Sequence, residues 1–210
     1  RIDYYLNIIE KAGLRVEDRF CDIHISEEDS EFTDKFLKEQ GIREKDFLVG
    51  INAGGNWRPK RWPKENWAAL ADYLIRDLGA RVIITGGQQD KPLAKDILGL
   101  MKEKPIIACG ALNLKQFGAL CKRLDLFISA DTGPLHIANA TGAKQIIALF
   151  GPTSPDITGP VPVKNTIILQ KDPGCKIPCY VVDCKDNRCM KMITPEDVME
   201  KVRLIKVNQR

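Results

Sequence analysis

The chain has 210 residues, of which 44% are hydrophobic and 29% charged, so it can bury a full core and general disorder is excluded. Its 32 basic and 28 acidic residues leave a net charge of only +4, which argues against a nucleic-acid-binding protein. No apolar run approaches the roughly 20 residues that a membrane-spanning helix needs. The sequence opens Arg1-Ile2-Asp3 without a methionine, and we therefore expect a piece of a longer protein.

The first 45 residues are predicted to form two helices. One helix is expected within residues 1–20, followed by a short extended piece. The acidic run at 27–31 opens a second helix over about 29–40, and Gly41 ends it.

From residue 47 onward, short apolar runs alternate with helical patterns. The apolar runs predict buried strands at 47–52, 81–85, 105–108, 126–129 and 145–150. The 3.6-residue spacing of apolar side chains predicts helices over 63–78, 91–101, 114–124 and 134–141. Continuously apolar strands separated by helices indicate a parallel sheet that is covered on both faces. We therefore predict an α/β fold, a doubly wound Rossmann-like parallel sheet over residues 44–170.

The C-terminal part is predicted to be a loop followed by a helix. Residues 172–192 are rich in cysteine and are expected to be a loop. Thr194 is a good N-cap and Pro195 a good first residue for a last helix that runs to about 206. The sequence has no dinucleotide fingerprint after a strand, no Walker A motif and no G-x-S-x-G elbow, and His24 and His136 are its only histidines.

The sharpest candidate site is the segment 131–140, DTGPLHIANA, which directly follows a predicted strand. Gly133 allows a ligand to approach the backbone, and the proline after it fixes the first helical residue. The N-terminus of the helix then offers free N–H groups and the positive end of its dipole, which suits a phosphate. His136 in the first turn can reach the same anion. The alternative is that Asp131 and Thr132 only cap the helix.

Two further polar loops leave the same edge of the predicted sheet. Residues 52–63, NAGGNWRPKRWP, carry two glycines and three cations, and Lys60 suits a diphosphate. Residues 86–90, GGQQD, end in Asp90, which can bind ribose hydroxyls. Each loop alone also fits a structural role, whereas three such loops at the carboxyl ends of parallel strands favour a ligand site. A fourth turn at 150–155 is interpreted as structural only.

The seven cysteines fall into two groups. Three are dispersed, and two of these, Cys109 and Cys121, have the pattern of small core residues. The other four are Cys175, Cys179, Cys184 and Cys189. Four thiols within 15 residues are enough for a tetrahedral zinc site, but the irregular spacing lacks the usual paired knuckles. Zinc or another thiophilic metal, disulfide pairing and free structural thiols remain alternatives, and the odd total favours a reducing compartment.

The motifs together resemble one enzyme family. D-T-G-P-x-H-x-A-x-A-x-G over 131–142, with L-F-G-P-T-x-P over 149–155, resembles the signature of family 9 glycosyltransferases, the ADP-heptose:lipopolysaccharide heptosyltransferases. K-x-W-P-x-x-x-W over 60–67 is similar to the donor loop of that family. The Cys-rich loop and T-P-E-x-V over 194–198 resemble the heptosyltransferase II branch.

The resemblance implies a domain arrangement. It covers residues 47–200, and family members have two Rossmann-like domains in a GT-B arrangement with the active site in the cleft between them. This chain resembles the C-terminal half, so residues 46–210 would be the nucleotide-sugar-binding domain. Residues 1–45 would be the end of the N-terminal acceptor domain or the interdomain crossover.

The resemblance also implies catalytic roles. Thr132 and Gly133 would bind the donor diphosphate through backbone N–H groups, with Asp131 beside them near the sugar and His136 supporting the turn. Lys60 would neutralise the leaving ADP. Lys60 and Asp131 are therefore the predicted catalytic residues, while the general base would be a carboxylate of the missing N-terminal domain.

Three further positions would bind the donor. Asn56 stands where the family often has a phosphate-binding serine or threonine. Asp90 is chosen over Gln88 as the ribose ligand because only Asp90 supplies a charge. Leu112 would meet the adenine face. No metal or other cofactor is expected to be required, because the cations and the helix terminus neutralise the diphosphate.

We therefore expect an inverting heptosyltransferase that moves a heptosyl residue from ADP-heptose to the lipopolysaccharide inner core. It would work in the cytoplasm at the inner face of the bacterial inner membrane, in peripheral contact with that membrane. The isolated chain would be inactive because it lacks the acceptor half. The alternative is a non-catalytic nucleotide-binding α/β module with a structural or metal-binding cysteine loop. The sequence does not identify the acceptor sugar.

Overall fold

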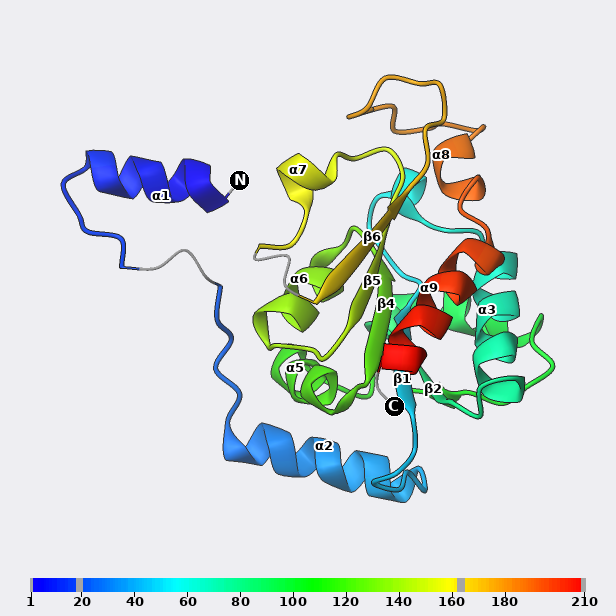
Figure 1. Ribbon diagram of the computed structural model, residues 1–210. Helices are drawn as coiled ribbons and strands as arrows, with labels where there is room; N and C mark the ends of the chain where they lie inside the picture. Colours follow the sequence, from blue (N-terminus) through cyan, green and yellow to red (C-terminus); the bar gives the residue numbers. More distant parts are fainter. Residues whose placement is uncertain (1, 18–20, 162–164, 209–210) are drawn as a thin grey trace.

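The computed structural model describes residues 2–17, 21–161 and 165–208 (Figure 1). Its strands are β1 (Leu48–Asn52), β2 (Arg81–Thr85), β3 (Ile106–Ile107), β4 (Leu126–Ala130), β5 (Ile146–Phe150) and β6 (Thr166–Gln170). Its α-helices are α1 (Ile2–Lys11), α2 (Glu27–Glu39), α3 (Lys64–Arg76), α4 (Lys91–Leu98), α5 (Leu114–Arg123), α6 (Gly133–Ala140), α7 (Pro155–Thr158), α8 (Arg188–Lys191) and α9 (Pro195–Asn208). Two short 3₁₀ helices are η1 (Arg58–Lys60) and η2 (Gln88–Asp90).

The six strands form one parallel sheet in the order β3-β2-β1-β4-β5-β6. The predicted α/β fold with a doubly wound parallel sheet is confirmed. In the register of the sheet, Asn52 at the end of β1 pairs with Thr85 of β2 on one side and with Ser129 of β4 on the other. The apolar central strands thus end in adjacent polar residues at one edge of the sheet.

Helices cover both faces of the sheet (Figure 1). One core lies beneath α3, α4, α8 and α9, and it includes Val49 and Ile51 of β1. The opposite core lies beneath α5 and α6, and α2 extends it by burying Leu37. Each central strand is therefore shielded on both sides, which explains why these strands are apolar throughout. None of the described helices is both long enough and apolar enough to cross a membrane.

Trp62 anchors the end of the loop after β1 to the short segment between α8 and α9 and to Trp67 of α3. Trp62 is buried, and its indole Nε1 donates a 2.7 Å hydrogen bond to the carbonyl oxygen of Ile193. Its ring meets Trp67 edge to face, with centroids 4.9 Å apart. Because Trp62 follows the polar residues of the 52–63 loop directly, this anchor holds that loop against the body of the domain.

Helix α2 packs on the sheet domain although it lies within the first 45 residues. Its N-terminus is closed by a capping box between Ser26 and Asp29. The hydroxyl of Thr33 donates to the carbonyl oxygen of Gln116 in α5, at 3.1 Å. The described chain therefore forms one packed unit from α2 to α9.

The element boundaries differ from prediction in a few places. β6 was not predicted, although it contains three consecutive apolar residues, Ile167, Ile168 and Leu169. α4 ends at Leu98 rather than at 101, because Gly99 follows it. The short α8 lies inside the segment that was expected to be a loop.

Gly50 at the centre of β1 gives a test of the packing. A Cβ at this position would lie 2.4 Å from Cδ1 of Leu124 and 3.1 Å from the Phe127 ring. We expect Gly50→Ala to lower the free energy of unfolding by about 1–3 kcal/mol, because the added methyl group would overpack the core. Urea denaturation followed by circular dichroism measures this change.

Gly99 provides the matched control for Gly50. Its backbone is helical, and an added Cβ would make only ordinary contacts of 3.5 Å and 3.6 Å. Gly99→Ala is expected to leave the stability unchanged or to raise it by up to about 1 kcal/mol. Equal stability of the two variants would contradict the packing of β1 described above.

Candidate functional site

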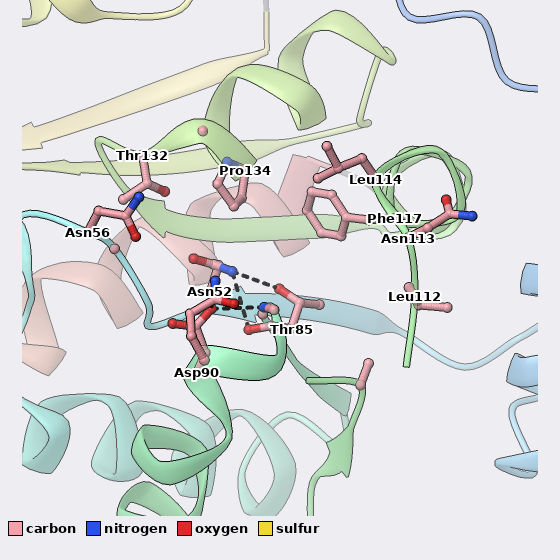
Figure 2. A pocket seen from close by; sticks show the side chains of 16 residues that line it. Asn52, Asn56, Thr85, Asp90, Leu112, Asn113, Leu114, Phe117, Thr132 and Pro134 are labelled. Atoms are coloured by element: carbon pink, nitrogen blue, oxygen red, sulfur yellow. Dashed lines mark hydrogen bonds between the residues drawn. The ribbon is translucent and has the colours of Figure 1, made fainter. Parts of the chain in front are cut away.

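A deep pocket of about 270 Å³ opens at the carboxyl edge of the sheet (Figure 2). Its polar wall includes Asn52, Asn56, Thr85, Asp90, Asn113 and Thr132. Its apolar wall includes Ala108, Leu112, Leu114, Phe117 and Pro134. The loops that follow β1, β2, β3 and β4 all contribute. The pocket thus lies where parallel α/β sheets place their ligands.

The floor of the deep pocket is set by the ends of β1 and β2. The side-chain nitrogen of Asn52 donates to the carbonyl oxygen of Thr85 at 3.2 Å and lies 3.4 Å from its hydroxyl. The Thr85 hydroxyl in turn donates to the carbonyl oxygen of Ile51 at 3.0 Å. These bonds give both side chains fixed orientations.

Asp90 lies beside this floor. One oxygen of its carboxylate accepts the Gly87 N–H at 2.8 Å, as the third residue of a capping box. The other oxygen lies against Gly54, where an added Cβ would approach it to 2.4 Å. Gln88 turns away instead, donating to the carbonyl oxygen of Gly110 at 3.0 Å. Asp90 and Gln88 were the two candidates for the predicted ribose ligand; Asp90 lines the pocket and Gln88 does not.

The N-terminus of α6 closes the end of the deep pocket. Thr132 is the N-cap residue, but its side chain makes no capping hydrogen bond and lies within hydrogen-bonding distance of Ser129 and Ala130 instead. Among the described residues, the backbone N–H groups of Thr132 and Gly133 have no hydrogen-bond acceptor. A Cβ at Gly133 would meet nothing within 4 Å, so this terminus is open. Free N–H groups and the helix dipole make it suited to an anion.

A second hollow of about 300 Å³ adjoins the first and shares Thr132 and Gly133 with it. It is lined by Lys60, Asp131, His136 and residues of α7. The α6 N-terminus therefore faces both spaces. An elongated ligand with an anionic centre can lie across it with one part in each space.

Asp131 is the buried charge at the back of the second hollow, with only 3% of its surface exposed. Its Oδ2 accepts hydrogen bonds from Lys60 Nζ at 2.7 Å, from Thr153 Oγ1 at 2.7 Å and from Thr158 Oγ1 at 2.8 Å. His136 Nε2 lies 3.8 Å from the other oxygen, beyond hydrogen-bond distance.

The protonation state of Asp131 follows from these contacts. Burial of Asp131 by itself would raise the pKa of its carboxyl group. The attraction of His136 and the hydrogen bonds from Lys60 and the two threonines outweigh burial and hold that pKa well below its usual range. Asp131 is therefore a carboxylate, and its charge is matched by the partly buried Lys60 ammonium group.

The structure brings the eight predicted binding residues to these two spaces. The deep pocket contains Asn56, Asp90, Leu112, Thr132 and Gly133, and the second hollow contains Lys60, Asp131, Thr132, Gly133 and His136. Their roles toward a ligand remain predictions. The alternative, that Asp131 and Thr132 only cap the helix, finds no support, because the described helix terminus has no side-chain capping hydrogen bond.

Several lining residues were missed by the sequence analysis. Asn52 and Thr85 are polar residues that end apolar strands, and that position could have revealed them. Phe117 lies on an amphipathic helix, where its pattern is that of a core residue. Thr153 reaches Asp131 from the turn at 150–155 that was interpreted as structural, and Thr158 reaches it from the end of α7; no local pattern indicates either contact.

The four clustered cysteines line one small cavity of about 40 Å³ beside Pro59 and Pro152. All four are free thiols. Burial is the main cause that raises the pKa of the Cys189 thiol. Within residues 2–17, 21–161 and 165–208, no group of three or more histidine, cysteine or acidic side chains is arranged to hold a metal ion. The zinc interpretation is thus not supported.

The fold and the position of the pocket place the chain among Rossmann-like α/β proteins that bind a ligand at the carboxyl ends of parallel strands. Comparison with known proteins identifies the family within this class. The sequence model of glycosyltransferase family 9 (heptosyltransferase) matches residues 5–187, and the chain belongs to this family.

Individual relatives agree with this assignment. The chain is 30% identical over 206 residues to lipooligosaccharide heptosyltransferase 2 of Campylobacter jejuni subsp. jejuni serotype O:6, a match that covers 95% of the chain and 62% of the relative. A solved family 9 glycosyltransferase from Veillonella parvula superposes with a TM-score of 0.83 at 29% identity, over 98% of this chain and 60% of that one.

A more distant structure shares the fold alone. The E. coli heptosyltransferase WaaC, solved with ADP, has a TM-score of 0.61 at 19% identity, over 82% of this chain and 48% of that one. The chain therefore spans about three fifths of the length of the relatives that it matches well.

The low pKa of Asp131 predicts a pH-dependent stability difference. We expect Asp131→Asn to lower the free energy of unfolding by about 2–4 kcal/mol at pH 7, because Lys60 loses its buried counter-charge. A depressed carboxyl pKa stabilises the folded state above the ordinary value of 3.8, and this contribution is lost as the pH falls through the folded-state value. The difference between wild type and variant should therefore shrink below about pH 4.

Urea denaturation at several pH values between 3 and 7 measures this difference. The exposed Asp156 on α7, which lines the same hollow, supplies the control Asp156→Asn. A pH-independent difference for Asp131→Asn would show that the ionised carboxylate does not stabilise the fold.

Proposed function

We propose that this chain is the donor-binding half of an inverting heptosyltransferase. The whole protein would transfer a heptosyl residue from ADP-heptose to the inner core of lipopolysaccharide. The observation that carries the proposal is the pair of joined spaces that meet at the open N-terminus of α6, with Lys60 beside it. Membership of family 9 and the heptosyltransferase named among the relatives support the substrate class.

The shapes of the two spaces support the following placement of the donor. The base fits the apolar end of the deep pocket, near Leu112 and Phe117. The diphosphate lies across the N–H groups of Thr132 and Gly133, where the dipole of α6 favours negative charge. The sugar then extends into the second hollow, toward Asp131 and His136.

Lys60 is the charge that assists departure of ADP. The bond to Asp131 holds its ammonium group at the back of the second hollow. As the bond between the sugar and the diphosphate breaks, negative charge grows on the phosphate oxygens, and a fixed cation stabilises that change. The anion site consists of Lys60 and backbone N–H groups, so we propose that no cofactor is needed.

Asp131 is not the base that activates the acceptor. Its Oδ2 already accepts three hydrogen bonds, and it lies beside the helix terminus that would hold the leaving group. A base must face the acceptor hydroxyl on the opposite side of the anomeric carbon. We therefore propose that the acceptor site and the base come from the part of the protein that the relatives have and this chain lacks.

The remaining parts of the proposal concern organisation and place. Residues 1–45 would form the crossover from the acceptor domain, with α2 docked on the donor domain, and residues 46–210 would form the donor domain. The protein would work in the cytoplasm at the inner face of the inner membrane, where its lipopolysaccharide acceptor is accessible. Family membership does not favour a non-catalytic module.

Titration calorimetry tests the donor site on the chain itself. We expect ADP to bind with modest affinity, because closure against a second domain is lost, and we expect no transfer of heptose by the 210-residue chain alone. Lys60→Ala should weaken ADP binding about 10- to 100-fold, the cost of one charge-assisted contact. A folded wild-type chain that gives no heat at millimolar ADP would refute the donor site.

Kinetics in the whole protein test the role of Lys60. Lys60→Ala should lower kcat by about 10²–10³-fold and change KM less, because the charge matters most in the transition state. Lys64→Ala is the matched control, since Lys64 begins α3 and pairs with the exposed Asp96 at 2.8 Å. A Lys60→Ala enzyme with the kcat of the Lys64→Ala control would show that Lys60 is only a surface charge.

A further inference from the structure

Asn52 is a buried polar side chain that is only half satisfied. It is 2% exposed, and its nitrogen is bound to Thr85 as described above. Its side-chain oxygen, Oδ1, has no hydrogen-bond partner among the described residues, although Asn52 lines the deep pocket. Oδ1 is not among the fully buried atoms of the described residues, so it stays open to the pocket, where a ligand can reach it.

The orientation of the Asn52 amide is determined by its neighbour. The Thr85 hydroxyl donates its only proton to the Ile51 carbonyl oxygen, so it offers only acceptor positions to Asn52. The Thr85 carbonyl oxygen is also an acceptor. Asn52 must therefore turn its NH₂ group toward Thr85, because the flipped amide would place oxygen against two acceptors. Oδ1 is consequently the atom left for a ligand.

The position of Oδ1 identifies the part of a ligand that it meets. In Figure 2 the amide of Asn52 lies between Thr85 and the side of the pocket formed by Asn56 and Asp90, with its oxygen away from Thr85. The apolar base end, at Leu112 and Phe117, lies beyond Thr85. The floor at Asn52 thus lies between the base end and the N-terminus of α6.

Asp90 presents a second acceptor in the same part of the pocket. Its Oδ2 is occupied by the Gly87 N–H, while its Oδ1, which faces Gly54, has no partner in the described part of the chain. Two neighbouring acceptors, one of them charged, repel phosphate oxygens and require hydrogen-bond donors. In a nucleoside diphosphate, the group between base and phosphates that donates two hydrogen bonds is the ribose diol.

We infer that Asn52 is a specificity-determining residue, whose Oδ1 accepts a hydrogen bond from one ribose hydroxyl while Asp90 accepts the bond from the other. The inference rests on the proposed donor site and adds a requirement for ribonucleotides over deoxyribonucleotides. A deoxy ligand leaves Oδ1 unpaired, and a site built to pair a hydroxyl rejects the analogue that lacks it.

Calorimetric titration of the chain with ADP, 2′-deoxy-ADP and 3′-deoxy-ADP tests this inference. Wild type should bind ADP about tenfold more tightly than either analogue, since each analogue leaves one acceptor unpaired. Asn52→Leu keeps the size of the side chain and removes the acceptor. It should lose the discrimination against one of the two analogues and retain the discrimination against the other.

Asn66→Leu is the matched control, because Asn66 lies on α3 and donates to the Ile193 carbonyl oxygen at 3.4 Å, away from the pocket. It should keep both affinity ratios. If Asn52→Leu does not fold, Asn52→Ser, whose shorter side chain withdraws the oxygen, is compared in the same way. Thermal unfolding of each variant checks that the titrated protein is folded.

The outcomes separate this inference from the proposed function. A folded wild type that binds no ADP refutes the donor site itself. Wild type that binds ADP and both analogues equally overturns the inference and leaves the donor site intact. The inference is also overturned if Asn52 variants keep both affinity ratios, or weaken all three ligands by the same factor, because Asn52 then has only a structural role.

Discussion

The carboxylate of Asp131 joins three separate loops at one buried point. Lys60 comes from the loop after β1, Asp131 itself from the loop after β4, Thr153 from the turn after β5 and Thr158 from the adjoining helix α7. A buried charge is tolerated only when it is paired and hydrogen-bonded, and Asp131 meets both conditions. The arrangement of the second hollow therefore depends on this interaction, since each loop is fixed by a bond to the same oxygen.

A site for a diphosphate needs a cation that is already in place and donors that contact the anion. The pairing of Lys60 with Asp131 supplies the first of these. A lysine that is free to move would lose side-chain entropy on meeting an anion, whereas Lys60 is already held at 2.7 Å from Asp131. In the proposed donor site, the diphosphate itself meets the uncharged N–H groups of Thr132 and Gly133. The proposed site thus combines a cation that is already held in place with neutral backbone donors.

Most of the fold was predictable because its signals are local. Buried parallel strands are apolar throughout, and this pattern located β1, β2, β4 and β5 and hence the edge where a ligand binds. β6, the edge strand beside β5, was missed although Ile167–Leu169 form a short apolar run. The candidate site was located for the same reason as the strands, since Gly133, Lys60 and Asp90 lie in the segments that follow β4, β1 and β2.

What the sequence could not reveal are contacts between distant side chains. The pairing of Lys60 with Asp131 joins residues 71 positions apart, and the bond from Thr153 spans 22 positions. Trp62 is buried and donates to the carbonyl oxygen of Ile193, 131 positions away, a partner that no local pattern indicates. Phe117 looked like a core residue, and it is one, but it also faces the pocket.

The polar groups at the carboxyl ends of the strands show a common rule. Ser129 and Thr132 lie within hydrogen-bonding distance of each other, and the Thr85 hydroxyl donates to the backbone of β1. The Ser129, Thr132 and Thr85 side chains are thus satisfied within the protein. The free groups of the described residues that line the deep pocket are separated by type. Backbone donors lie at the α6 end, and acceptors from Asn52 and Asp90 lie at the floor. A ligand complementary to this order has acceptors at one end and donors in its middle, which is the polarity of a ribonucleoside diphosphate and the reverse of an elongated cationic ligand.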